Sequence, residues 1–130
     1  MTIKELLMSM PDYIGGKGCS QDEIDECEKK LGLKFAADYR EYLLTVGLAC
    51  FENIELTGIC KSARLNVVSA TLREKESDDS IPKNYYLIND CGIDGLLIWQ
   101  SSSGKVYMTS PTSRKRKIAE SFEEFISSLK

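Results

Sequence analysis

The stretch GLLIWQSSSGKVYMT, residues 95–109, decides the fold of this 130-residue chain. Its run over 96–99 is apolar at consecutive positions, which is typical of a strand covered on both faces. Residues 101–104 form a short connection with glycine at its end, and a second β-prone segment follows over 105–109. The stretch therefore predicts a β-hairpin in which Gly104 adopts a positive φ.

The middle of this stretch, Ser103-Gly104-Lys105, is similar to part of a phosphate-binding loop. That loop needs a glycine five positions before the Gly-Lys pair, and a Ser or Thr after the lysine. Trp99 and Val106 stand at those places. Tryptophan blocks the close approach of the backbone to a phosphate, and valine has no hydroxyl for magnesium. The sequence therefore predicts a turn here, and it predicts no nucleotide or other cofactor.

Upstream of the hairpin the apolar residues recur at helical spacing. A short helix is predicted before Pro11, and a second begins at a capping box formed by Ser20 and Glu23 and ends at Gly32. A third helix ends at Gly47. The buried stripes of these helices are predicted to be Ile3, Leu6, Leu7 and Met10; Ile24, Cys27 and Leu31; and Phe35, Tyr39, Tyr42, Leu43 and Val46.

Strand signals follow the third helix, and one further helix closes the chain. Residues 54–57, 66–68 and 85–89 are β candidates, and the polar segment 73–80 is predicted to be a solvated loop. A second capping box at 121–124 begins the last helix, whose predicted buried residues are Phe122, Phe125, Ile126 and Leu129. This order predicts one α+β domain over residues 1–130, with a mainly antiparallel sheet flanked by N-terminal helices and a C-terminal helix.

Composition narrows the classes of function. The chain has no histidine, which removes histidine-dependent acid–base, nucleophilic and metal chemistry, so we expect no enzyme and no metal site. Its five cysteines have no C-x-x-C spacing, which favours a reducing cytoplasm over a disulfide framework. No apolar run approaches the ~18 residues of a membrane span. The net charge of −3 argues against general binding of nucleic acid.

Several short motifs occur in a fixed order along the chain. Leu31-Gly32 ends the second helix, a tyrosine-bearing helix follows, and a strand ends at Gly58. The remaining motifs are Gly104-Lys105-Val106-Tyr107 in the hairpin and Ala119-Glu120-Ser121-Phe122-Glu123-Glu124-Phe125-Ile126 in the last helix. In this order and spacing, residues 20–129 resemble the SUKH superfamily of Smi/Knr-type proteins. The chain departs from that pattern at Phe35-Ala36-Ala37 and at Val46-Gly47-Leu48, where the family often has a proline and a double glycine.

The resemblance implies an α+β domain without catalytic activity. Many bacterial members look like immunity proteins of contact-dependent or polymorphic toxin systems, which bind a cognate toxin domain, frequently a nuclease, in the cytoplasm. Other members act as regulatory or scaffolding modules. The expected partner is therefore a toxin domain, and the chain itself is expected to be a monomer or a weak homodimer.

Acidic and aromatic side chains supply the candidate contacts. Acidic residues line the second helix, where capping already accounts for them, and the segment 73–80. An acidic surface would suit a nuclease, whose active site is basic. Of two adjacent tyrosines in a strand, the outward one is a candidate anchor, although strand aromatics more often fill a core. The candidate partner-binding residues are Glu74, Glu76, Asp78, Asp79, Tyr85 and Tyr86.

The residues from Arg114 to Lys117 are four consecutive basic residues, the densest cluster of like charge in the sequence. Such short runs are normally solvated, and a loop before the last helix is the simplest interpretation. Contact with an acidic protein or with the phosphates of a nucleic acid remains a rival interpretation.

Overall fold

The predicted hairpin is present in the computed structural model, which describes residues 1–130 apart from the side chains of Ser113 and Arg114. Strand β5 (Leu97–Ser101) pairs antiparallel with β6 (Val106–Ser110). Gly104 has a φ of 103°, and its N–H donates to the carbonyl of Ser101 over 2.9 Å. The turn interpretation of Ser103-Gly104-Lys105 is therefore confirmed.

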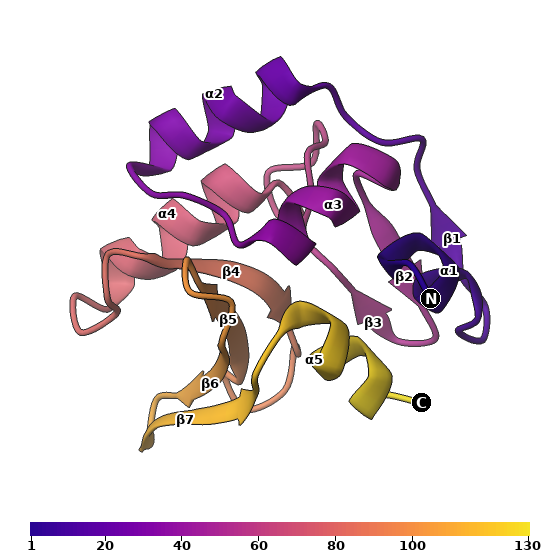
Figure 1. Cartoon of the computed structure of the whole chain (residues 1–130). Coiled ribbons are helices and arrows are strands. Elements are labelled where there is room, and N and C mark those ends of the chain that lie inside the picture. Colours follow the sequence, from indigo (N-terminus) through magenta and orange to yellow (C-terminus); the bar gives the residue numbers. More distant parts are fainter.

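The hairpin forms the centre of a four-stranded antiparallel sheet with the order β4-β5-β6-β7 (Figure 1). The outer strands are β4 (Tyr85–Asp90) and β7 (Ser113–Ala119). Strand β7 contains the basic run, so the prediction of a loop at Arg114–Lys117 was wrong. Charged side chains at consecutive positions hide the alternation by which a half-buried strand is recognised.

A second, smaller antiparallel sheet has the order β1-β2-β3. Its strands are β1 (Ile14–Gly15), β2 (Ala49–Phe51) and β3 (Ile54–Glu55). A bridge between Leu56 and Asn89 joins the end of β3 to β4. The two sheets are therefore connected through backbone pairing.

Four helices agree with the predicted ones: α1 (Ile3–Met8), α2 (Gln21–Leu31), α3 (Ala37–Thr45) and α5 (Phe122–Ser128). Both halves of the predicted capping box of α2 form, because Ser20 accepts from the Glu23 N–H and Glu23 accepts from the Ser20 N–H. Only half of the box predicted for α5 forms. The Glu124 carboxylate accepts from the Glu120 N–H instead of the Ser121 N–H.

Two predictions were wrong because residues Val67–Ser77 form a helix, α4. Residues 66–68 are not a strand, and most of the segment 73–80 is helix rather than loop. Asn66 caps the helix by accepting from the N–H groups of Val68 and Ser69. The β-branched pair Val67-Val68 is a β signal in isolation, and this cap overrides it.

The core lies mainly between one face of the larger sheet and the helices α1, α3 and α5. The other face is covered in part by α4, which packs against β4, and α2 packs on α4 and α3 (Figure 1). Trp99, Tyr85 and Leu87 face this second side, together with Ala70 of α4. Both faces of β5 are therefore buried near Trp99, as its unbroken apolar run predicts.

The arrangement is an α+β fold with antiparallel sheets, as expected from the order of the elements. Within the described part of the chain, no helix has the length and apolar character needed to cross a membrane.

Candidate partner-binding groove

A groove lies between the C-terminal end of α4 and the second face of the larger sheet. It consists of two adjoining cavities of about 500 and 560 Å³, which share Asp78, Ile81, Thr109, Ser110 and Pro111. We call this the acidic groove, because acidic residues from two elements stand along it. Its further lining residues are Glu74, Ser77, Ser80, Pro82, Asp90, Gly95, Leu97, Trp99 and Lys115.

Three carboxylates come together at the rim of the acidic groove. Glu74 comes from the last turns of α4, where it forms an ion pair with Arg73 at 3.0 Å, Asp78 follows that helix, and Asp90 ends β4. The Asp78 carboxylate accepts hydrogen bonds from the Ser80 N–H and hydroxyl, at 3.0 and 2.6 Å, and these bonds lower the pKa of Asp78. Asp78 is therefore ionised at neutral pH and held in one orientation.

The floor of the groove is apolar and rigid. Trp99 is fully buried, and its indole N–H donates to the Thr109 hydroxyl over 2.9 Å. Leu97 beside it is half-buried. Because Trp99 exposes no surface, the apolar contact area comes from Leu97, on a strand fixed by pairing on both sides, and from Ile81 and Pro111 beside it.

The groove ends at a basic residue. The Lys115 ammonium lies 5.3 Å from the centre of the Tyr85 ring, and that ring stacks on Tyr107 with 4.9 Å between ring centres. Burial, with Tyr107 beside it, raises the pKa of Tyr85 to about 12, so the phenol is neutral. The surface charge therefore changes sign from the α4 side of the groove to the β7 side.

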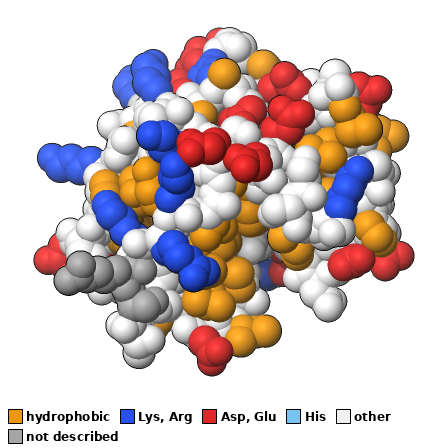
Figure 2. Space-filling model, turned by 60° about the horizontal axis from the view of Figure 1, so that its bottom comes forward, with side chains coloured by type: hydrophobic (Ala, Val, Ile, Leu, Met, Phe, Trp, Pro, Cys, Tyr) orange, Lys and Arg blue, Asp and Glu red, His pale blue; other side chains and the backbone are white. Residues whose placement is uncertain are grey.

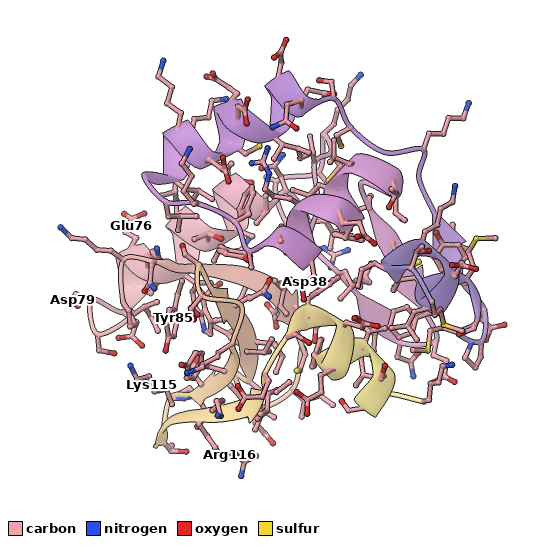
Figure 3. All side chains as sticks on the ribbon, in the orientation of Figure 1. Asp38, Glu76, Asp79, Tyr85, Lys115 and Arg116 are labelled. Atoms are coloured by element: carbon pink, nitrogen blue, oxygen red, sulfur yellow. The ribbon has the colours of Figure 1, made fainter. Side chains whose placement is uncertain are left out.

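The predicted contact residues divide into three groups. Glu74 and Asp78 line the groove, whereas Glu76 and Asp79 are exposed beside it (Figure 3). Tyr85 is 4% exposed and Tyr86 is 0% exposed. The expectation that one of the two tyrosines faces outward was wrong, because both faces of β4 are covered.

Tyr86 has a structural role in the core. Its hydroxyl accepts from the Ala36 N–H at 3.0 Å and donates to the Gln100 side-chain oxygen at 2.7 Å. Burial raises its pKa well above the ordinary value. Tyr86 is therefore a core residue and does not contact a partner.

The sequence did not indicate Asp90, Leu97 or Thr109 as groove residues. The turn-rich segment 89–95 does predict that a strand ends near Asp90. No pattern within the chain shows that this strand end lies opposite the end of α4, because that helix was not predicted.

Three of the acidic residues of α2 lie along a different groove. Asp22, Glu23 and Glu26 line it together with Lys30 and Lys61, and its volume is about 640 Å³. Two lysines line this groove, against one in the acidic groove, and Glu23 is already used by the cap of α2. We regard this groove as the weaker acidic candidate.

A third groove, of about 380 Å³, lies under α5 on the core side of the larger sheet. Figure 2 shows hydrophobic surface on this face with Lys and Arg side chains gathered beside it. We call it the apolar groove; its lining includes Ile54, Ile98, Met108, Arg116, Ile118, Phe125 and Leu129.

Three of the five cysteine thiols have raised pKa values. Burial raises the pKa of Cys19 to about 11 and also raises the pKa of Cys27 and Cys91. The thiolate, which is the nucleophile and the metal ligand, is therefore disfavoured at these positions. Among the described side chains, no group of three or more Cys, Asp or Glu residues is arranged to hold a metal ion.

Comparison with known proteins gives one clear result. The family model SUKH_5, described as SMI1-KNR4 cell-wall, matches residues 2–129. No curated protein matches the chain. The match extends the resemblance read from residues 20–129 to nearly the whole chain and includes α1. The chain therefore belongs to the SUKH_5 family of SMI1-KNR4 proteins.

Proposed function

We propose that the protein is an immunity protein that binds a cognate toxin domain and neutralises it stoichiometrically. The acidic groove carries this proposal, because it combines three carboxylates with an apolar floor on a paired sheet. Protein interfaces that bind tightly have an apolar anchor region and a polar rim. A nuclease toxin, whose substrate-binding cleft is basic, has the complementary charge.

The mechanism is occlusion of the toxin's active site or of the cleft that leads to it. The carboxylates of the rim accelerate the encounter, and the apolar floor slows dissociation. An interface of about 1,600 Å² in total is sufficient for such a complex. We expect a 1:1 complex in the cytoplasm of the producing cell, formed by a protein that is a monomer or a weak homodimer on its own.

The proposal requires no catalysis by this chain. The absence of histidine and the raised pKa values of Cys19, Cys27 and Cys91 support a binding role. Inhibition then depends on the amount of protein, and one equivalent inactivates one equivalent of toxin.

Charge reversal on α4 tests which surface binds. Glu74→Lys with Glu76→Lys reverses one carboxylate that lines the groove and one that is exposed beside it, and lysine at the C-terminal end of a helix is favourable, so the fold is retained. We expect the affinity for the toxin domain encoded immediately upstream to fall by about tenfold to hundredfold. Asp78→Lys with Asp79→Lys is a second pair, and it is expected to act in the same direction.

The matched control reverses two exposed acidic residues elsewhere, Glu52 in the turn between β2 and β3 and Glu123 on α5. Its net charge changes by the same amount, so a general electrostatic effect lowers both affinities alike. Equal affinities for the control and the Glu74/Glu76 variant would show that the acidic groove is not the interface.

A second candidate function is a regulatory or scaffolding module. The description of the matching family names the cell wall and no toxin, which favours this alternative. The genes beside this one distinguish the two. A toxin domain encoded immediately upstream favours immunity, and an unrelated neighbourhood favours regulation.

A further inference from the structure

Strand β7 is a free edge of the larger sheet. It pairs with β6 on one side, and no other strand of the described chain pairs with its outer side. Figure 1 shows β7 along the border of the sheet, with no helix over its outer side. The opposite border is protected, because β4 contacts β3 and α4. An edge of this kind presents unpaired N–H and C=O groups to any extended chain that approaches it.

The side chains of β7 divide between the two faces of the sheet. Lys117 pairs with Tyr107 and Lys115 lies over Tyr85, so both lysines stand on the face of the second apolar cluster. Arg116 pairs with Met108, and both Arg116 and Ile118 line the apolar groove. Among the described side chains of β7, Lys115 and Lys117 therefore stand on one face, and Arg116 and Ile118 stand on the other.

The positive charge at the edge is only partly compensated. Lys117 forms an ion pair with Glu120. Neither Lys115 nor Arg116 has an ion pair with any described carboxylate, and both are exposed. The edge therefore has capacity for further negative charge.

The same charges decide which extended chains the edge accepts. Two copies of β7 would place like charges opposite each other, which destabilises a strand pair. Edge lysines in general prevent pairing with identical edges in this way. A strand with carboxylates on one face gains ion pairs instead.

We propose that the outer edge of β7 binds an extended acidic segment of a protein partner, which adds to the β4–β7 sheet as a fifth strand. Backbone hydrogen bonds supply affinity, and the alternating side chains supply specificity, as in other complexes formed by strand addition. Carboxylates on one face of the segment meet Lys115 and Lys117. Apolar side chains on its other face meet Ile118 and the border of the apolar groove. This inference does not depend on the proposed immunity function.

The test uses an eight-residue peptide of alternating glutamate and valine, labelled with a fluorophore and titrated with the full chain. We expect saturable binding, and about tenfold weaker binding by the variant Lys115→Glu with Arg116→Glu. The control variant Lys4→Glu with Lys17→Glu changes the net charge equally at exposed positions elsewhere and should bind like the native chain. A peptide in which lysine replaces glutamate should not bind.

Two further measurements separate strand addition from simple charge attraction. Methylation of the backbone nitrogen at alternate residues removes the N–H donors along one edge of the acidic peptide. If that edge pairs with β7, the methylated peptide should not bind. Hydrogen exchange of β7 amides should slow when the unmodified peptide is present. The proposal would be overturned if peptides methylated along either of their two edges still bound and hydrogen exchange of the β7 amides did not slow. Preferential binding of a twelve-nucleotide single-stranded RNA, lost in the Lys115/Arg116 variant, would overturn it in favour of nucleic acid.

Discussion

Asp38 shows how one residue can join distant parts of this fold (Figure 3). Its carboxylate accepts from the Gln100 side-chain amide at 3.1 Å and from the N–H groups of Phe122 and Glu123 at 2.7 and 3.3 Å. It therefore ties α3 to β5 and to the first turn of α5. Asp38 lies within the predicted third helix, but its partners lie 62, 84 and 85 residues away, beyond the reach of any local pattern.

Replacing Asp38 by alanine should destabilise the protein strongly. The change leaves three N–H donors without their acceptor, and each lost bond of this kind costs about 1 kcal/mol. We expect the free energy of unfolding in urea to fall by about 2–3 kcal/mol. The control is Asp25→Ala, which removes an ion pair of a largely exposed carboxylate to Arg40 and should cost under about 1 kcal/mol. Equal losses in the two variants would contradict this role of Asp38.

Helix α4 is the element that sequence reasoning missed, and it forms one wall of the acidic groove. Its buried residues Val67, Ala70 and Thr71 have the spacing of a helix, but two of them are small or polar and give a weak apolar signal. The hairpin, the α2 cap and the closing helix were predictable because glycine, serine and regular apolar spacing act locally. The groove wall that α4 forms was not predictable from the sequence, because α4 is stabilised by its cap at Asn66 and by packing on β4 and α2.

Loss of the α4 cap gives the second test, at the scale of this element. Asn66→Ala removes the acceptor of two N–H groups and the donor to the Cys60 carbonyl. We expect the free energy of unfolding to fall by about 1–2 kcal/mol, whereas Asn66→Asp, which keeps the cap, should lose less. Hydrogen exchange should locate the difference between the two variants in the first turn of α4. An unchanged rate there would show that the cap does not stabilise this helix.

The stability of the whole molecule should depend on pH at both ends of the scale. Ion pairs lower the pKa of Glu55, through Arg64, and of Glu120, through Lys117, and the Ser80 bonds lower that of Asp78. Each folded-state pKa lies below the unfolded one, so this stability is present above the unfolded values of 4.5 and 3.8 and is lost as the pH falls.

The loss of stability at high pH comes from groups whose pKa is raised, rather than lowered, in the folded protein. Burial raises the pKa of Cys19 from 9.0 to about 11 and also raises the pKa of Cys27 and Cys91, so above pH 9.0 the unfolded chain ionises first and stability declines. We expect the melting temperature to be level from about pH 5 to 9 and to fall on both sides. Cys19→Ser should make the alkaline decline shallower and leave the acid limb unchanged. A native-like alkaline decline in this variant would contradict the assignment to Cys19.

The groove, the fold and the family membership together make stoichiometric binding of a protein partner the central claim. The most direct test is a titration of the toxic activity of the upstream-encoded domain with this protein. We predict a linear loss of activity that is complete at one equivalent, and a 1:1 complex that the Glu74/Glu76 variant forms only weakly. Full toxin activity in the presence of excess protein, or no complex with that domain, would contradict the claim.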